Sequence, residues 1–323
     1  MTRIGANALP RPRLGISACL LGQAVRYDGG HKLDRFLQEE LGRLVEWVPV
    51  CPEVECGLGV PREAMRLVGD PDSPRLLTHR SGVDLTAQMK DWARVRLAAL
   101  EREDLLGFVF KSRSPSSGLR RVKVYDTNGV PGRGGVGIFA RALVERFPLL
   151  PVEEDERLHD PALRVGFIER IFCLARYRSE AKSSGKIADL IDFHARQKIQ
   201  LMAHSPALLR EMNALLARAR DFTARQLASR YEALLLQTLA VRVTAPRMAN
   251  AIQHMLGHFK RELSADEQQE MAEILAQYRQ GLLPLIVPMV LVQHHVRRCR
   301  PAYLIQQSLL APHPLELKLR NHA

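Results

Sequence analysis

The stretch Thr86–Gly118, "TAQMKDWARVRLAALEREDLLGFVFKSRSPSSG", joins three patterns. Residues 86–103 place apolar side chains at the spacing of one helix face, and residues 105–112 form a nearly continuous apolar run. The polar loop that follows, residues 111–118, is rich in serine and is called the serine loop below. It contains no strong base or metal ligand. A helix that leads into a buried strand is typical of a βαβ unit and predicts a parallel sheet.

Similar patterns extend through the first half of the chain. Further apolar runs predict strands over residues 13–20, 44–52, 122–126 and 149–156. Further periodic stretches predict helices over residues 31–44 and 135–148. We therefore expect an α/β domain with a Rossmann-like parallel sheet and helices on both faces.

The second half of the chain reads as helix throughout. Helices are expected over residues 162–180, 186–204, 205–220, 224–241, 246–263 and 264–285. Ser205 followed by Pro206 is a typical helix start, and Ser264 with Glu267 has the form of a capping box. An all-α C-terminal domain follows, with domains expected at residues 1–158 and 159–323.

The composition indicates a folded protein. A chain of 323 residues with 46% hydrophobic content can form two cores of ordinary size. The N-terminus has no apolar leader, and no apolar run is long enough to cross a membrane, so we expect a cytoplasmic protein. The five cysteines are an odd number without a secretory leader, which favours free thiols or metal ligands over disulfides.

The charge is unevenly distributed. Of the formal net charge of +12, residues 1–160 contribute 24 Lys and Arg against 22 Asp and Glu, and residues 161–323 contribute 23 against 13. The excess of +10 in the helical half predicts contact with a polyanion and favours nucleic acid as that partner. A basic surface without a partner is the alternative.

Two cysteines lie at the ends of expected strands. Cys19 lies in "ISACLLG" and Cys51 in "VPVCPEVECG", and each precedes a polar, glycine-containing loop. Alone, each is explained as a small buried residue. Because the carboxyl ends of parallel strands share one edge of a sheet, both thiols and the serine loop should meet there. Converging thiols favour zinc or an iron–sulfur cluster, although two cysteines complete neither site.

These motifs resemble a known family. The stretches "GISACLLGQAVRYDGGHK", "WVPVCPEVECGLGVPRE" and "FKSRSPSSG" resemble the hallmarks of the DUF523 family, which includes thiouracil desulfidases. The helical half resembles the DUF1722 domain in "FHARQKIQLMAHSP", "QHMLGHFKRELS" and "PHPLELKLRNH". Fusions of the two resemble RudS-type desulfidases, which implies removal of sulfur from 2-thiouracil or from 4-thiouridine in tRNA.

The resemblance implies a [4Fe-4S] cluster held by three cysteines, with the fourth iron open to the substrate sulfur. Cys19 and Cys51 match the first two ligands. The third belongs in the family's "SPSCG", which here reads "SPSSG", so Ser117 takes its place. A hydroxyl is a harder and less acidic ligand than a thiol. The serine loop therefore resembles a cluster-binding loop without its thiolate.

The resemblance also implies catalytic roles for Glu53 and Ser114. Glu53 follows Cys51 by two positions, where a carboxylate could activate the water that replaces sulfur, and Ser114 could hydrogen-bond the pyrimidine. From the residues alone, a salt bridge for Glu53 and a helix-cap role for Ser114 are simpler. Secondary candidates for binding uracil or phosphate are Ser112, Arg26, Tyr27, Asp28, Lys32 and Arg62.

Three other features favour structural roles. Cys56 is interpreted as a structural thiol and not as a replacement ligand. The glycine-rich segment Gly132–Phe139 lacks the context of a dinucleotide fingerprint and is interpreted as a flexible helix entry. The histidines of the helical half, including the pair His254 and His258, favour packing or RNA contacts over zinc.

Two functions therefore stay open. The first is an iron–sulfur desulfidase acting on thiolated uracil, with tRNA as the expected partner of the basic helical domain. The second is a non-catalytic nucleic-acid-binding protein whose cluster site has degenerated.

Overall fold

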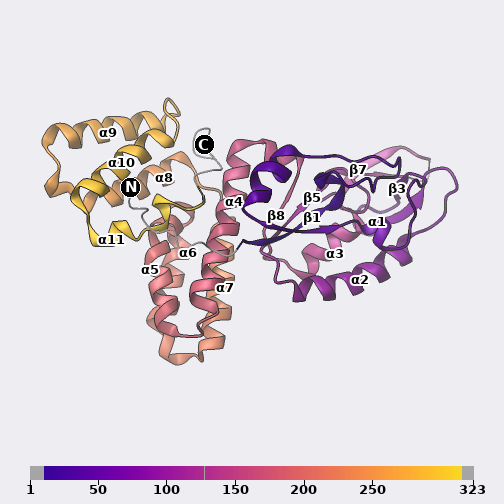
Figure 1. Cartoon of the computed structure of the whole chain (residues 1–323), viewed down its shortest axis with the longest axis horizontal. Coiled ribbons are helices and arrows are strands. Elements are labelled where there is room, and N and C mark those ends of the chain that lie inside the picture. Colours follow the sequence, from indigo (N-terminus) through magenta and orange to yellow (C-terminus); the bar gives the residue numbers. More distant parts are fainter. Residues whose placement is uncertain (1–10, 127, 315–323) are drawn as a thin grey trace. The chain divides into compact units, whose positions relative to one another are not determined.

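The computed structural model of the chain describes residues 11–126 and 128–314 (Figure 1). They form two compact units, one spanning Arg11–Asp160 and the other beginning at Pro161. The first unit is α/β and the second is helical, which confirms the expected fold class. Most of the C-terminal motif "PHPLELKLRNH", from residue 315 onward, lies outside the described residues.

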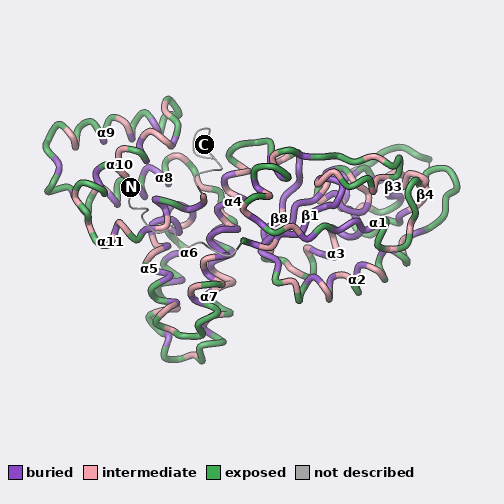
Figure 2. The backbone as a smooth tube through the Cα atoms, viewed as in Figure 1, coloured by how far each residue is buried: buried purple, intermediate pink, exposed green. Residues whose placement is uncertain are grey.

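The first unit contains a parallel four-stranded sheet in the order β2-β1-β5-β8. Its strands are β1 (Arg13–Ser17), β2 (Glu46–Val50), β5 (Gly107–Phe110) and β8 (Val152–Glu154). The central strands β1 and β5 are largely buried (Figure 2), as their continuous apolar runs predict. Because β1 lies between β2 and β5, the segments that follow these three strands emerge side by side.

Two helices cover one face of this sheet. They are α2 (Thr86–Arg102) and α3 (Ile138–Arg146), and their apolar side chains pack on Phe108 and Phe110. Gly15 is required by this packing, because a Cβ at that position would lie 2.1 Å from the ring of Phe108 on the neighbouring strand. The sequence thus leaves space on β1 for a ring from β5.

A second sheet in the order β4-β3-β6-β7 differs from the expectation of one parallel sheet. Its strands are β3 (Met65–Val68), β4 (Arg75–Thr78), β6 (Val122–Tyr125) and β7 (Pro131–Gly135). Only β3 and β6 are parallel. Assigning residues 122–126 to the first sheet was therefore wrong, and so was interpreting all of Gly132–Phe139 as a helix entry. At Gly134 a Cβ would lie 2.6 Å from the backbone of Arg121, so glycine permits this close strand pairing.

The helix expected over residues 31–44 is shorter than predicted and irregular. A π-helical turn, Phe36–Glu40, is followed by a 3-10 turn, Leu41–Arg43. The preceding N–H groups of Lys32 and Asp34 donate instead to the carbonyls of Cys19 and Leu20. These bonds hold the segment against the 3-10 turn Ala18–Leu21 that follows β1.

The second unit consists of helices joined by short turns. They are α4 (Pro161–Arg176), a π-helical turn (Tyr177–Lys182), α5 (Ile187–His204), α6 (Pro206–Ala217), α7 (Ala224–Ala240), α8 (Ala245–Gly257), α9 (Ala265–Arg279), α10 (Ile286–Cys299) and α11 (Ala302–Ile305). The Ser205 side chain caps α6, and Ser264 with Glu267 forms the predicted capping box of α9. In the described residues no helix is both long and apolar enough to cross a membrane.

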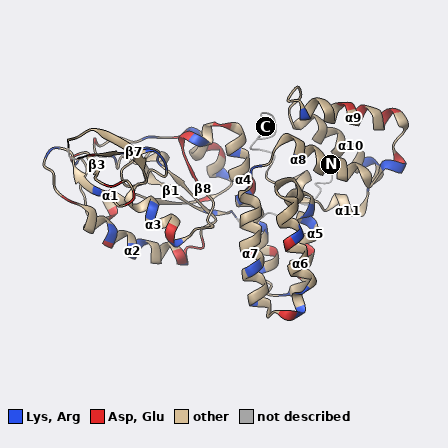
Figure 3. Ribbon diagram, turned by 180° about the vertical axis from the view of Figure 1, so that it is seen from behind, with Lys and Arg blue, Asp and Glu red and all other residues tan. Residues whose placement is uncertain are grey.

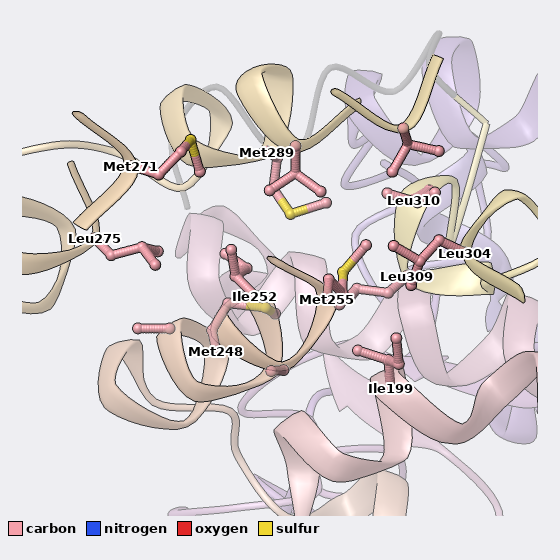
Figure 4. Packing of buried hydrophobic residues seen from close by; sticks show 14 of the residues in the cluster. Ile199, Met248, Ile252, Met255, Met271, Leu275, Met289, Leu304, Leu309 and Leu310 are labelled. Atoms are coloured by element: carbon pink, nitrogen blue, oxygen red, sulfur yellow. The ribbon is translucent and has the colours of Figure 1, made fainter. Parts of the chain in front are cut away.

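The core of the helical unit contains several methionines, among them Met248, Met255 and Met289 (Figure 4). Four histidines in the described part of this unit are buried, namely His194, His204, His295 and His313. His194 contacts Asn213 and Tyr231 through its two ring nitrogens. Burial lowers the pKa of His204 to about 4, and its Nδ1 lies 2.8 Å from the Val241 carbonyl. A neutral, buried imidazole of this kind has a packing role inside the helical unit, which is one of the roles that the sequence analysis favoured.

Candidate functional site

The strand register brings the two candidate cysteines, Cys19 and Cys51, to one edge of the first sheet, which we call the cysteine edge. Ser17 at the end of β1 pairs with Val50 at the end of β2. Cys51 follows Val50 directly, Cys19 follows Ser17 by two residues, and both are buried. The end of β5 is fixed to the same edge, because the Lys111 N–H donates to the Ser17 hydroxyl at 2.9 Å.

Glu53 connects two loops of this edge. It lies in the first turn of the short helix α1 (Pro52–Glu55), for which Cys51 is the N-cap. The Cys51 thiol lies 3.5 Å from its Oε2, and the Ser116 hydroxyl donates to its Oε1. Arg62 Nη2 lies 4.0 Å from Oε2. The carboxylate therefore joins the loop after β2 to the serine loop after β5.

The serine loop is a tight turn organised by Ser114. Its Oγ accepts the N–H groups of Ser116 at 3.3 Å and Ser117 at 3.2 Å. Its oxygen also lies 2.8 Å from Ser116 Oγ. Because the Ser116 hydroxyl already donates to Glu53, Ser114 donates in this pair. No helix begins here, so Ser114 caps a turn where the sequence suggested a helix cap.

Ser116 is the site residue that the sequence analysis missed. It is fully buried, and its hydroxyl lies between Ser114 and Glu53. The adjacent Ser117, at the position where the resemblance implies a third ligand, is also buried. Four serines in one loop were the only local signal, and nothing in the sequence distinguishes the one that reaches Glu53.

The start of α3 holds this loop in place. The N–H groups of Gly137, Ile138 and Phe139 donate to carbonyls of the loop, at 2.7, 3.2 and 2.9 Å. The acceptors are Gly118, Pro115 and Ser116 in that order. The helix start thus satisfies its own free N–H groups by binding the serine loop.

This arrangement predicts a strong effect for Gly137→Ala. A Cβ at Gly137 would lie 2.5 Å from the carbonyl carbon and oxygen of Ser116. We expect a loss of about 1–3 kcal/mol in the free energy of unfolding, measured with denaturant. Gly59→Ala is the matched control, because its Cβ would meet nothing closer than 4.0 Å. Equal losses in the two variants would contradict this account of the loop.

A buried ion pair closes the other side of the loop. Lys111 Nζ lies 2.9 Å from Asp155 Oδ2, and the Ser112 N–H donates to Asp155 Oδ1 at 2.7 Å. Burial alone would raise the pKa of Asp155, but these bonds hold it below its usual value. The Ser112 hydroxyl contacts Lys111, so this secondary candidate is engaged within the loop.

The two thiols are weakly acidic. Burial, together with the charge of Glu53, raises the pKa of Cys19 to about 11 and that of Cys51 to about 12. Both are therefore protonated at neutral pH, and metal binding there would release protons. Cys56 donates to the Glu53 carbonyl and packs against the core of the second sheet, as a structural thiol does.

Four of the remaining secondary candidates lie in the loop beside Cys19, and the fifth, Arg62, lies on a segment bonded to that loop. The Lys32 N–H donates to the Cys19 carbonyl, and the Arg62 N–H donates to the Tyr27 carbonyl, both at 2.9 Å. Arg26 stacks over the half-exposed ring of Tyr27 at 5.4 Å. Asp28 accepts the Gly30 N–H and lies 3.5 Å from Arg26 Nε, so it is engaged within its own turn.

As a metal centre, this edge is incomplete. The described residues hold no group of three His, Cys, Asp or Glu side chains able to bind an ion. The thiols of Cys19 and Cys51 suit a soft metal, and the third side chain expected for a cluster, Ser117, is a hydroxyl. Of the three ligands that the resemblance implies, two are therefore thiols and the third is a hydroxyl.

Two family models match the chain. A 2-thiouracil desulfurase model matches residues 14–155, and a model of DUF1722, a family of unknown function, matches residues 198–314. The uncharacterized protein YbgA of Escherichia coli (strain K12) is 26% identical over 156 residues, which are 47% of this chain and 90% of YbgA. The solved structure of TudS, a [4Fe-4S]-dependent thiouracil desulfidase, is 31% identical and has a TM-score of 0.39. The match covers 49% of this chain and 100% of TudS.

Proposed function

Because the chain belongs to the 2-thiouracil desulfurase family over residues 14–155 and carries a DUF1722 domain over residues 198–314, we propose that it removes sulfur from thiolated uracil. The proposed substrates are 2-thiouracil and 4-thiouridine in tRNA. In the proposed hydrolysis, the oxygen of water replaces sulfur on the ring carbon and sulfide leaves, so no external oxidant or reductant is consumed. The contact of Glu53 with Cys51 and Ser116 carries this proposal.

We assign the cofactor position to Cys19, Cys51 and Ser117. A [4Fe-4S] cluster bound there would supply a soft Lewis acid for the thiocarbonyl sulfur. The hydroxyl of Ser117 makes the site a weak one for such a cluster. Restoring a thiol at this position is therefore the direct test.

Glu53 is the proposed general base. A carboxylate at the cysteine edge can take the proton from the attacking water. Its hydrogen bonds from Ser116 and Cys51 fix its orientation, which matters because a base must lie within reach of the proton it removes. Ser114 is proposed to help orient Glu53, because it donates a hydrogen bond to Ser116, which in turn donates to Glu53.

The loop beside Cys19 is proposed to bind the uracil or its phosphate. Tyr27 is half-exposed and carries Arg26 over its ring, so it offers an aromatic surface next to a cation. Lys32 and Arg62 lie on segments bonded to Cys19 and Tyr27. Asp28 is engaged within its own turn beside Arg26 and supports this surface, whereas Ser112 is engaged within the serine loop.

One observation favours the second function, a non-catalytic nucleic-acid-binding protein. A hydroxyl replaces the third expected ligand, while the helical half keeps a charge excess of +10. Under this alternative the cysteine edge would bind no cluster even with its thiol restored.

Both functions predict salt-dependent binding of RNA. If phosphates contact the basic half, affinity for tRNA should fall as a power of the salt concentration, because each neutralised phosphate releases counterions. Six contacts or more would lower the affinity at least about a thousandfold between 50 and 200 mM salt, to judge from typical proteins. Binding of the full-length protein can be measured by fluorescence anisotropy with labelled tRNA. Affinity that is independent of salt would exclude the RNA role.

A further inference from the structure

A cavity lies away from the cysteine edge, in the groove between α2 and α3. Its volume is about 660 Å³, within the range of small-molecule sites. Its apolar lining comes from Leu97 and Ala98 of α2 and from Ile138 and Ala142 of α3. The turn Asp72–Pro74 between β3 and β4 closes one end.

The two helices run side by side in the same direction. Near their starts, the rings of Trp92 and Phe139 have centroids 5.2 Å apart. Near their ends, Arg146 Nη2 lies 2.6 Å from Glu101 Oε2. Residues at equal heights therefore face one another across the groove, which places Lys90 and Arg94 of α2 near the level of Arg141 on α3.

These three cations make one end of the groove positive (Figure 3 shows the basic segments of both helices in blue). Lys90 and Arg94 are exposed; in the described ranges Lys90 forms no ion pair, and Arg94 reaches Asp91 only at 3.9 Å. Arg141 donates from Nη2 to the Pro71 carbonyl at 2.8 Å, while its Nε is buried and has no acceptor among the described residues. The fourth cation, Arg146, is already paired with Glu101.

Acidic groups only partly offset this charge. Asp72 on the closing turn and Glu145 on α3 line the groove, against four Lys and Arg side chains. An uncharged apolar ligand would leave the cations without partners. An anion with an apolar body would instead pair with the cations and cover the apolar lining of the groove. The Ser73 hydroxyl on the closing turn adds a neutral donor.

We propose that this groove binds a phosphorylated nucleoside. The phosphate lies among Lys90, Arg94 and Arg141, and the base lies against the floor of Leu97, Ile138 and Ala142. The choice of a nucleoside as the apolar body rests on the proposed function. The phosphate belongs either to a free nucleotide or to an RNA chain, and the two sources share this chemistry.

The test measures binding of uridine monophosphate to the full-length protein by calorimetry. The double variant Lys90→Gln/Arg94→Gln should raise Kd about tenfold, since each lost charged contact at an exposed position contributes modestly. The double variant Arg43→Gln/Arg102→Gln removes the same charge from exposed positions outside the groove and should leave Kd unchanged. Uridine, which lacks the phosphate, should bind at least about tenfold more weakly than the monophosphate.

Further binding measurements identify the source of the phosphate. Tighter binding of oligouridylate than of the monophosphate, lost in the groove variant and kept in the control, assigns the groove to RNA. Binding of the monophosphate alone assigns it to a free nucleotide. The proposal is overturned if inorganic phosphate binds as tightly as the nucleotide, if no nucleotide binds, or if the two double variants lose equal affinity.

The proposed nucleotide binding in the groove and the proposed desulfidase activity can fail independently of each other. Free 2-thiouracil has no phosphate, so its desulfidation should not change in Lys90→Gln/Arg94→Gln. If no variant desulfidates thiouracil, the proposed function fails while the binding measurement still decides the groove.

Discussion

Ser117→Cys is expected to raise the iron retained after anaerobic reconstitution at least about tenfold, towards the four atoms of one cluster. A thiolate is a far better ligand for iron than a hydroxyl. The replacement should also preserve the loop, because it is the N–H of Ser117 that donates to Ser114. Iron analysis and the visible absorption of the reconstituted protein measure the effect, and activity on 2-thiouracil should rise with iron content.

Ser112→Cys is the matched control. It places the same thiol, buried to a similar extent, earlier in the same loop, where the side chain contacts Lys111. Iron should rise in Ser117→Cys alone. An equal rise in both variants would indicate adventitious metal on any added thiol. Background iron in both would contradict the cluster proposal and favour the non-catalytic nucleic-acid-binding protein.

The positions of Cys19 and Cys51 could be predicted because they depend on local patterns. Each follows a short apolar run, and strands of a parallel sheet end at one edge. The register of Ser17 with Val50 shows that the two runs are neighbours in the sheet. Whether Ser117 completes a site with them stays a prediction that the iron measurement tests.

The contact between Ser116 and Glu53 could not be predicted in the same way. It joins residues 63 positions apart, and the side chains involved are determined by how α3 holds the serine loop. Periodicity identifies which elements form, but not which of several neighbouring serines turns toward a carboxylate. The resemblance to a known family supplied Glu53 and Ser114, and left Ser116 unassigned.

The second sheet was missed for a different reason. β3 and β4 are four-residue strands of a hairpin, and β7 is composed mostly of glycine. None of the three is rich enough in branched and aromatic residues to indicate a strand. Its pairing depends on close backbone approach at Gly134, which is a tertiary requirement. Composition alone therefore favoured a loop.

Glu53→Gln, measured in the Ser117→Cys background, is expected to lower kcat on 2-thiouracil about a hundredfold or more while iron content stays unchanged. The amide keeps an oxygen that can accept from Ser116, so the loop should remain in place. It cannot take a proton from water. The loss should appear in kcat more than in KM, because the base acts in the transition state.

The matched control for Glu53 is Glu55→Gln on the same short helix. Glu55 accepts the Cys51 N–H at 2.9 Å and lies 3.1 Å from Arg96 Nε, so it supports the turn without a contact to the serine loop. Its replacement should lower stability and leave kcat nearly unchanged. If Glu53→Gln loses iron together with activity, Glu53 supports the metal site and is not the base. Equal kcat losses in the two variants would show that the geometry of the Cys51 turn, and not proton transfer by Glu53, limits the reaction.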